Sequence, residues 1–193
     1  MELLTVGHGT LTEDRLGALL TGAGVERLID VRTAPGSRRH PHVSRAALEV
    51  WLPRLGIPYS WEPRLGGWRK PRPDSLNTAL HNASFRGYAD YMRTPPFWEA
   101  LDGVLSLARE YRTVVMCSET VYWRCHRRLI ADGAELGREA QVQHLGHDAS
   151  LARHRLTDGV RQDGDLLVYD SGAPAMWTDQ ASLGGETGGF EYE

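Results

Sequence analysis

The order of apolar segments along this chain predicts an α/β fold, with a parallel, Rossmann-like open sheet of about five strands and helices on both of its faces. Apolar runs of strand length alternate with stretches of helical periodicity, which is the order that builds a parallel sheet. The run Val114–Met116 is continuously apolar, as in a strand buried on both faces. The length of 193 residues suits one domain, which we place at residues 1–170.

Each strand is expected where a short apolar run is bounded by turn residues. The five predicted strands are Leu3–Val6, Val25–Val31, Ile57–Trp61, Arg112–Cys117 and Ala140–Leu145. Helices are expected where a capping residue precedes an amphipathic stretch. Their predicted starts are the capping box Thr10–Glu13, Ser44, the pair Thr94 and Pro95, and Trp123, with Gly137 ending the last helix. Leu166–Tyr169 is expected to be a strand or a packed segment.

The net charge of −3 conceals a basic body and an acidic tail. Residues 1–147 contain 19 Lys and Arg against 16 Asp and Glu, whereas residues 148–193 contain 3 against 9. Of the 22 basic residues 21 are arginine, whose planar side chain binds carboxylates and phosphates through two parallel hydrogen bonds. We expect residues 171–193, which are acidic and rich in glycine, to form a flexible tail.

The composition indicates a cytoplasmic protein. No apolar run reaches the roughly 20 residues needed to span a bilayer, so we expect no membrane contact. The N-terminal residues MELLTVGHG have no basic n-region and no cleavage pattern, so we expect no secretion signal. The two cysteines, Cys117 and Cys125, are therefore expected to be reduced thiols.

Cationic and aromatic side chains collect in the segments that follow the predicted strands. Ligands of open α/β sheets bind at the carboxyl ends of the strands, so this clustering predicts a site for an anionic ligand. Basic groups contact phosphates, while aromatic rings accept stacked bases. The predicted binding residues are His8, Arg32, Ser37, Arg38, Arg39, His40, Trp68, Arg69, Lys70, Arg86, Tyr88, Arg124, His126 and Arg127.

Five motifs stand out along the chain, TVGHGT, LIDVRTAPGSRRHPH, LGG, FRGYADYM, and VVMCSE followed by CHRRLIA. In this order they resemble the bacterial and archaeal family called domain of unknown function 488, over about residues 3–170. The resemblance implies a compact α/β fold, a polar site built from these motifs, and a link to nucleic-acid metabolism or repair. Family members carry an alanine where this chain has Ser118.

Two carboxylates, Asp30 and Glu119, end or follow predicted strands and form our candidate acid–base pair. An ionised carboxylate among arginines can orient a water and stabilise the oxocarbenium-like centre of glycosidic cleavage. Our first hypothesis is a DNA glycosylase-like hydrolase that removes an unusual or damaged base, with DNA a more expected partner than RNA. In the structural alternative, Asp30 orients Arg32 or Arg127, and Glu119 caps the following loop.

The thiols support a second hypothesis, a phosphatase-like or sulfurtransferase-like enzyme that uses Cys117 or Cys125. Cys125 is expected near a helix N-terminus and beside Arg124 and Arg127, an environment that lowers the pKa of a thiol. Two features oppose this second hypothesis. Six residues separate Cys117 from Arg124, where phosphatase loops have five, and the loop has no glycine for a tight anion nest.

Cys117, Cys125 and His126, together with His8, are also candidate metal ligands. The cysteines are not spaced as in a CxxC knuckle, neighbouring helical residues point in different directions, and arginines repel a cation. We therefore expect no metal and no other cofactor.

A third hypothesis is a non-catalytic module that binds nucleic acid or a phosphorylated ligand such as a nucleotide. The sequence predicts no oligomeric state.

Overall fold

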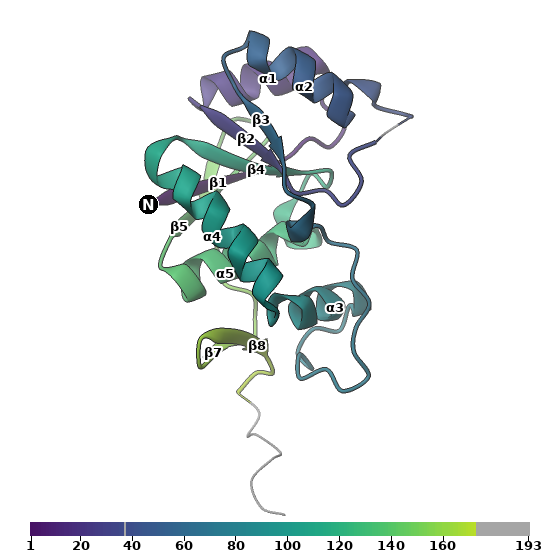
Figure 1. Cartoon of the computed structure of the whole chain (residues 1–193), viewed down its shortest axis with the longest axis vertical. Coiled ribbons are helices and arrows are strands. Elements are labelled where there is room, and N and C mark those ends of the chain that lie inside the picture. The colour runs from purple at the N-terminus through teal and green to yellow at the C-terminus, as the bar shows by residue number, and fades with distance from the viewer. Residues whose placement is uncertain (37, 173–193) are drawn as a thin grey trace, which may run out of the picture.

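In the computed structural model, which describes residues 1–36 and 38–172, six strands form one mostly parallel sheet, and the predicted α/β fold is confirmed (Figure 1). The strand order is β3-β2-β4-β1-β5-β6, and only the edge strand β6 runs antiparallel to its neighbour. The strands are β1 (Glu2–Gly7), β2 (Arg27–Asp30), β3 (Tyr59–Trp61), β4 (Thr113–Cys117), β5 (Gln141–Leu145) and β6 (Leu151–Arg153). A separate hairpin contains β7 (Val160–Asp163) and β8 (Leu166–Tyr169).

Helices cover both faces of this sheet, as the sequence predicts. They are α1 (Glu13–Gly22), α2 (Arg45–Arg54), α3 (Ala83–Met92), α4 (Pro95–Glu110) and α5 (Arg127–Arg138), with short 3₁₀ turns at Pro41–Val43, Pro63–Leu65 and Tyr122–Arg124. Figure 1 shows α1 and α2 on one side of the sheet and α4 and α5 on the other. The five predicted strands are all present; the first is longer by two residues than expected, and the other four are shorter by one to three residues.

Three details of the helices differ from the prediction. The cap of α1 is Thr12, whose side chain accepts a hydrogen bond from the Arg15 amide, and not a capping box at Thr10. The last helix begins four residues later than expected, because Cys125 is extended and ends the 3₁₀ turn. Helix α3 was not predicted, since its motif was assigned to a loop; Asn82 caps it by accepting from two backbone amides.

The alternation of side chains along the strands produces two cores, one on each face of the sheet. Leu4 and Val6 of β1 are buried against the apolar stripes of α1 and α2. Leu3 of the same strand points to the other face, where it joins Leu101 of α4 and Leu129 of α5. The parallel strands are therefore buried on both sides, which is why their sequences are continuously apolar.

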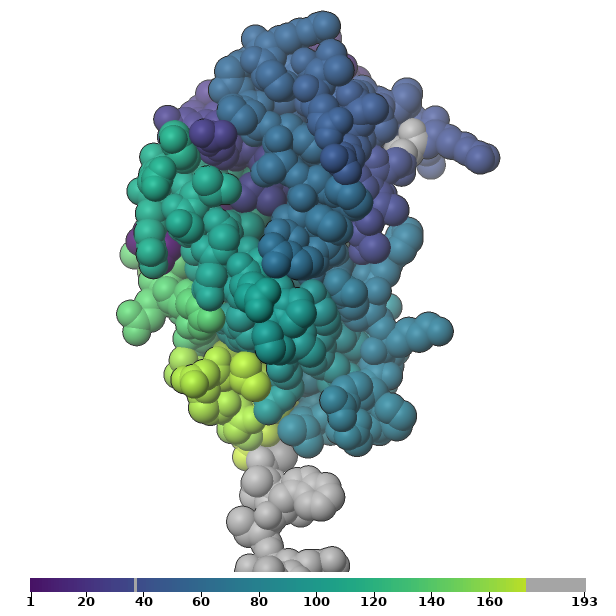
Figure 2. Space-filling view, in the orientation of Figure 1, coloured from purple at the N-terminus to yellow at the C-terminus, as the bar shows by residue number. Residues whose placement is uncertain are grey.

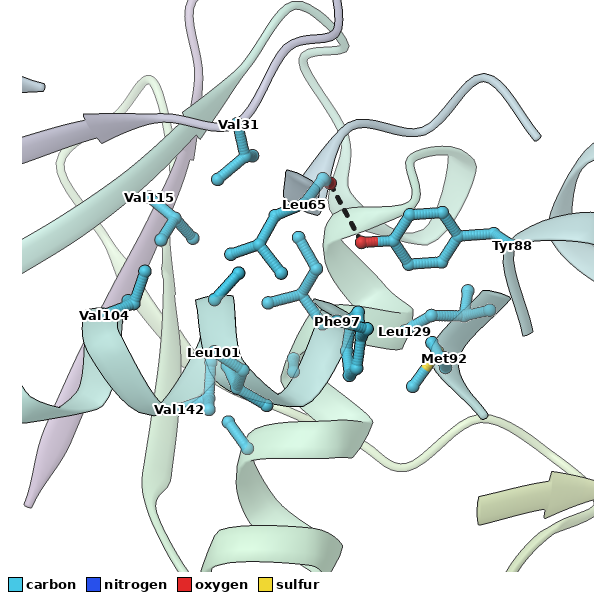
Figure 3. Close-up of a cluster of buried hydrophobic side chains, with 14 of the residues drawn as sticks. Val31, Leu65, Tyr88, Met92, Phe97, Leu101, Val104, Val115, Leu129 and Val142 are labelled. Atoms are coloured by element: carbon cyan, nitrogen blue, oxygen red, sulfur yellow. Dashed lines mark hydrogen bonds between the residues drawn. The ribbon is translucent and has the colours of Figure 1, made fainter. Parts of the chain in front are cut away.

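Tyr88 lies in the second core and not in a ligand-binding loop, which corrects its predicted place. Figure 3 shows its ring beside Met92 and Leu129, with the hydroxyl donating to the Leu65 carbonyl at 2.9 Å. The side chain is fully buried, so it has no exposed face on which a base could stack. Its pKa is raised well above the usual range by burial.

The long segment between β3 and α4 runs along one side of the molecule, as Figure 2 shows in blue and teal. Asp90 of α3 fixes this segment, because its carboxylate accepts from the Arg72 amide, the Ser75 hydroxyl and the Asn77 amide group. The predicted flexible tail lies, from residue 173 onward, outside the described residues.

We expect truncation of Leu101 to weaken the fold strongly. Leu101→Ala removes a fully buried side chain from the core beneath α4, so the free energy of unfolding should fall by about 2–5 kcal/mol. Val50→Ala, at a position 54% exposed on α2, is the matched control and should change it by less than about 0.5 kcal/mol. Urea denaturation measures both; equal effects would contradict the packing of α4 on the sheet.

Candidate functional site

A cavity of about 580 Å³ lies at the edge where the parallel strands end, the edge at which the sequence predicts a site. Gly7 of β1 pairs with Cys117 of β4, and Asp30 of β2 pairs with Met116, so three strands end side by side. The lining residues follow these strands or lie at the start of α3; they are Gly9, Thr10, Arg32, Thr33, Ala34, Gly67, Trp68, Ser84, Phe85, Cys117, Ser118, Glu119, Thr120, Arg124, Cys125 and His126.

Two sulfurs and one imidazole converge in the wall of this cavity. The Nδ1 atom of His126 lies 3.8 Å from the Cys117 sulfur and 3.7 Å from the Cys125 sulfur. Cys117 ends β4, whereas Cys125 is extended and precedes α5, so Cys117 meets His126, nine positions further along the chain. Gly67 covers the imidazole; a Cβ atom there would lie 2.5 Å from His126 Nδ1. Both cysteines are buried free thiols.

The surroundings make the two thiols unequal. The Cys117 thiol donates to Cys125, and this bond, followed by His126 and Arg127, lowers the pKa of Cys125 well below its usual range against the opposing effect of burial. The same bond and burial raise the pKa of Cys117 well above its usual range. Cys125 also lies just before the N-terminus of α5, where the helix dipole favours a negative charge. Cys125 is therefore the thiol that ionises first.

Arg127 lies directly behind the sulfur pair and is 1% exposed. Its Nε donates to the Cys125 sulfur at 3.4 Å, and its Nη2 donates to the carbonyls of Glu119 and Thr120. No carboxylate in the described residues lies within ion-pair distance of this guanidinium. Gly7 makes room for it, because a Cβ at Gly7 would overlap the Glu119 carbonyl oxygen.

A buried chain of hydrogen bonds runs from Arg127 away from the cavity. Arg127 Nη1 lies 3.4 Å from the Thr5 hydroxyl, which lies 2.7 Å from His144 Nδ1. His144 Nε2 lies 3.0 Å from His154 Nδ1, and His154 Nε2 lies 2.9 Å from an Asp132 oxygen. With neutral imidazoles, all of these hydrogen bonds can point the same way. Each group in the chain accepts from the group nearer Arg127 and donates to the next one, and the Asp132 carboxylate accepts the last bond.

The network of Thr5, Asp132, His144 and His154 was missed by the sequence prediction. Asp132 also accepts from the Tyr169 hydroxyl and the Thr157 amide, and the Tyr122 ring stacks on His144 at 3.5 Å. Burial, followed by His154 and Arg127, lowers the pKa of His144 to about 3. These residues are isolated polar positions within apolar elements, so only their positions in space reveal the network.

Asp30 does not line the cavity, and its carboxylate is fully occupied. It is completely buried; one oxygen accepts from the Arg32 amide and Nε, and the other accepts from Arg32 Nη2 and the Tyr59 hydroxyl. Glu119, in contrast, is exposed and lines the cavity. The structure therefore places the two candidate acids in different environments, and the alternative in which Asp30 orients Arg32 matches its contacts.

His8 belongs to this buried ion pair and not to the cavity wall. Its Nε2 lies 3.2 Å from Arg32 Nη1, and its Nδ1 lies 3.0 Å from the Gly9 carbonyl. Burial, followed by the charge of Arg32, lowers the pKa of His8 to about 4. His8 is thus neutral near pH 7 and accepts from Arg32, whose guanidinium lines the cavity with its charge balanced by Asp30.

Four of the predicted binding residues line the cavity, and Arg127 lies behind it. These four are Arg32, Trp68, Arg124 and His126. Trp68 is 80% exposed, and the exposed Arg124 guanidinium has no hydrogen-bond or ion-pair partner in residues 1–36 and 38–172. These two side chains can contact a ligand that enters the cavity.

The remaining predicted binding residues lie outside the cavity wall. Arg38, Arg39 and Lys70 are exposed, and His40 is half-buried. The guanidinium of Arg69 lies 3.8 Å above the Tyr91 ring, and Arg86 donates to the Leu80 carbonyl, so both are held by the fold. Ser37 lies outside the described residues.

The family model described as domain of unknown function DUF488 matches residues 12–134, which is more than half of the chain. The chain belongs to this DUF488 family. The match covers α1 to the middle of α5 and includes all of the cavity wall except Gly9 and Thr10. Searches of curated proteins and of solved structures found no significant match.

The helices of the DUF488 protein offer no candidate for a membrane span. In the described part of the chain, none is both long enough and apolar enough to cross a bilayer.

We expect Arg127 to be essential for the fold around the cavity. Arg127→Met leaves the carbonyls of Glu119 and Thr120 without their buried donor, so the free energy of unfolding should fall by about 2–4 kcal/mol. Arg124→Met removes an exposed guanidinium and should change it by less than about 0.5 kcal/mol. Chemical denaturation compares the two variants, and equal stability would contradict the supporting role of Arg127.

Acid should weaken the network at His144. Its folded pKa of about 3 lies below the usual histidine value of 6.5, so between these values the unfolded chain binds a proton that the folded chain does not. The stability advantage of the wild type over His144→Gln should therefore shrink as the pH falls from 6.5 toward 3. Denaturation across this range measures it, with the exposed His81→Gln as control. A constant difference would show that His144 protonates equally in both states.

Proposed function

We propose that this DUF488 protein is a thiol-dependent enzyme in which the Cys125 sulfur is the nucleophile. The observation that carries the proposal is the position of this sulfur. It faces the 580 Å³ cavity, accepts a hydrogen bond from Arg127 Nε at 3.4 Å, and lies 3.7 Å from His126 Nδ1. Positive groups and a helix N-terminus next to a cysteine are the environment in which thiols become nucleophiles.

This proposal takes the second hypothesis from the sequence over the first. A glycosylase mechanism with two carboxylates needs both acids at the scissile bond, about 5–9.5 Å apart with the substrate between them. Asp30 is sealed behind Arg32 and is bound to Tyr59, which leaves Glu119 as the one carboxylate that the described residues contribute to the cavity wall. Base removal from DNA is retained only as a mechanism that would depend on Glu119.

The cavity supports a substrate that carries both a negative group and a ring. Arg124 offers a guanidinium that has no partner among the described residues, and Trp68 and Phe85 offer aromatic surface in the same wall. Nucleotides and nucleic acids combine these features, because their phosphates bind arginine and their bases stack on aromatic rings. We propose such a substrate, DNA before RNA, with Arg38 and Arg39 on the loop after β2 as further phosphate contacts.

The proposed reaction is a group transfer. A lone pair of the Cys125 thiolate forms a bond to an electrophilic atom of the substrate, and the leaving group departs with the electron pair of the bond that breaks. A second acceptor, such as water, then releases the group and restores the thiolate. Arg127 keeps the sulfur in place, and the free state of both thiols supports a reducing, cytoplasmic location.

Alkylation of the reduced protein by iodoacetamide tests this proposal. At pH 7 Cys125 should react faster than Cys117, and faster than an ordinary thiol by on the order of ten-fold, since only a few per cent of such a thiol is ionised. Single-stranded DNA should slow the reaction at low salt, and Arg124→Met should remove this protection. The matched control is Arg54→Met, because Arg54 is exposed at the end of α2 and lies outside the cavity wall.

Mass spectrometry assigns the modified cysteine, and two results would count against the proposal. An unreactive Cys125 would refute the thiol nucleophile. A Cys125 whose reactivity is unchanged by DNA, RNA and nucleotides would refute the proposed substrate class. Release of a base from damaged DNA by Cys125→Ser, abolished in Glu119→Gln, would instead establish the glycosylase hypothesis.

A further inference from the structure

The distances among the two sulfurs and the imidazole are those of a tetrahedral metal centre. Ideal tetrahedral zinc, with bonds of about 2.3 Å to sulfur and 2.0–2.1 Å to nitrogen, has N···S edges of about 3.6 Å. The corresponding separations here are 3.8 Å from Cys117 Sγ and 3.7 Å from Cys125 Sγ to His126 Nδ1. All three candidate ligand atoms lie within 4.8 Å of one another.

The local backbone explains how residues with an unusual spacing form this cluster. The objection that neighbouring helical residues diverge does not apply, because Cys125 is extended and His126 is the cap before α5. Both side chains therefore face the end of β4, where Cys117 lies. The buried Nε2 of His126 has no partner in the described residues, so no acceptor there fixes the ring proton to either nitrogen.

From this geometry we infer that Cys117, Cys125 and His126 form a binding site for a thiophilic divalent cation, and that Zn²⁺ fits it best. Two thiolates and one imidazole are ligands that zinc prefers over oxygen-binding cations. Their two negative charges balance the cation, so the centre is neutral beside Arg127. The guanidinium then donates to a metal-bound sulfur through the same Nε contact of 3.4 Å.

Three protein ligands leave the fourth position of a tetrahedral cation open. All three line the 580 Å³ cavity, so this position faces the space that the substrate would enter. Structural zinc sites have four protein ligands, whereas centres with three protein ligands keep the fourth position for a water or a substrate.

The cation site uses the same sulfur as the proposed reaction, so a bound cation would regulate that reaction. This regulatory role rests on the proposed function, whereas the cation binding itself does not. A cation on Cys125 Sγ engages the lone pair that the nucleophile needs. The centre then exists in two exclusive states, a free thiolate that reacts and a cation-bound thiolate that does not.

Titration of the reduced full-length protein with Zn²⁺ against a chromophoric chelator tests the site directly. The wild type should bind one cation per chain. Cys117→Ser and His126→Gln should each weaken binding by more than roughly ten-fold, because loss of an outer-shell partner alone costs about 10–100-fold. His81→Gln, an exposed histidine outside the cavity, should bind as the wild type does. Co²⁺ should give the charge-transfer absorption of thiolate ligands in the wild type, a result that requires no variant.

Alkylation with and without Zn²⁺ separates this inference from the proposed function. Zn²⁺ should slow the reaction of Cys125 in the wild type and in His81→Gln, and should do so only at higher concentrations in Cys117→Ser and His126→Gln. Absence of zinc binding by the wild type, or equal affinity in all four proteins, overturns the inference and leaves a reactive Cys125 intact. Zinc binding by a chain whose metal-free Cys125 is inert overturns the proposed function and leaves the cation site standing.

Discussion

The buried guanidinium of Arg127 is the constraint on which the arrangement around the cavity depends. Removing such a charge from water costs several kcal/mol unless its donors are satisfied. Here carbonyl oxygens, a hydroxyl and a sulfur satisfy them without a carboxylate within ion-pair distance in the described residues. Each partner is thereby fixed: the loop after β4 must bring the Glu119 carbonyl inward, Gly7 must lack a side chain, and His144 must remain neutral.

This constraint also explains why the charge is balanced differently on the two sides of the cavity. The guanidinium of Arg32, on the β2 side, is neutralised by Asp30, and its remaining donor meets a neutral His8. The guanidinium of Arg127 has no such carboxylate in the described residues. The group next to it that can carry a negative charge is the Cys125 sulfur. Arg32 and Arg127 are both buried but affect their surroundings differently, because within the described residues only Arg32 has a carboxylate within reach.

Much of the fold could be predicted from the sequence, because parallel strands buried on both faces have continuous apolar runs and are separated by amphipathic helices. Helix α3 escaped prediction since arginine and aromatic residues in FRGYADYM resemble a binding loop, while its periodicity places Tyr88 and Met92 in the core. The edge strand β6 is three exposed residues, too short and polar to show a pattern.

The position of the cavity could also be predicted, because parallel strands end at one edge of the sheet, but the arrangement of the side chains around it could not. The sequence places Cys125 and His126 next to each other, and helical geometry would separate them; the extended backbone at Cys125 depends on contacts that no local pattern encodes. Likewise, the run Leu28–Val31 leaves open whether Asp30 orients Arg32 or faces the cavity, and nothing in it indicates the contact with Tyr59.

The place of β1 in the sheet has a consequence for how the family is delimited. This strand lies between β4 and β5, yet both β1 and β5 fall outside residues 12–134, the segment matched by the family model. A polypeptide cut to that segment would lose the middle of its sheet, and Asp132 would lose His154 and Tyr169. The unit that folds is therefore larger than the unit that sequence comparison detects, and gene fragments designed on the matched boundaries would encode an incomplete protein.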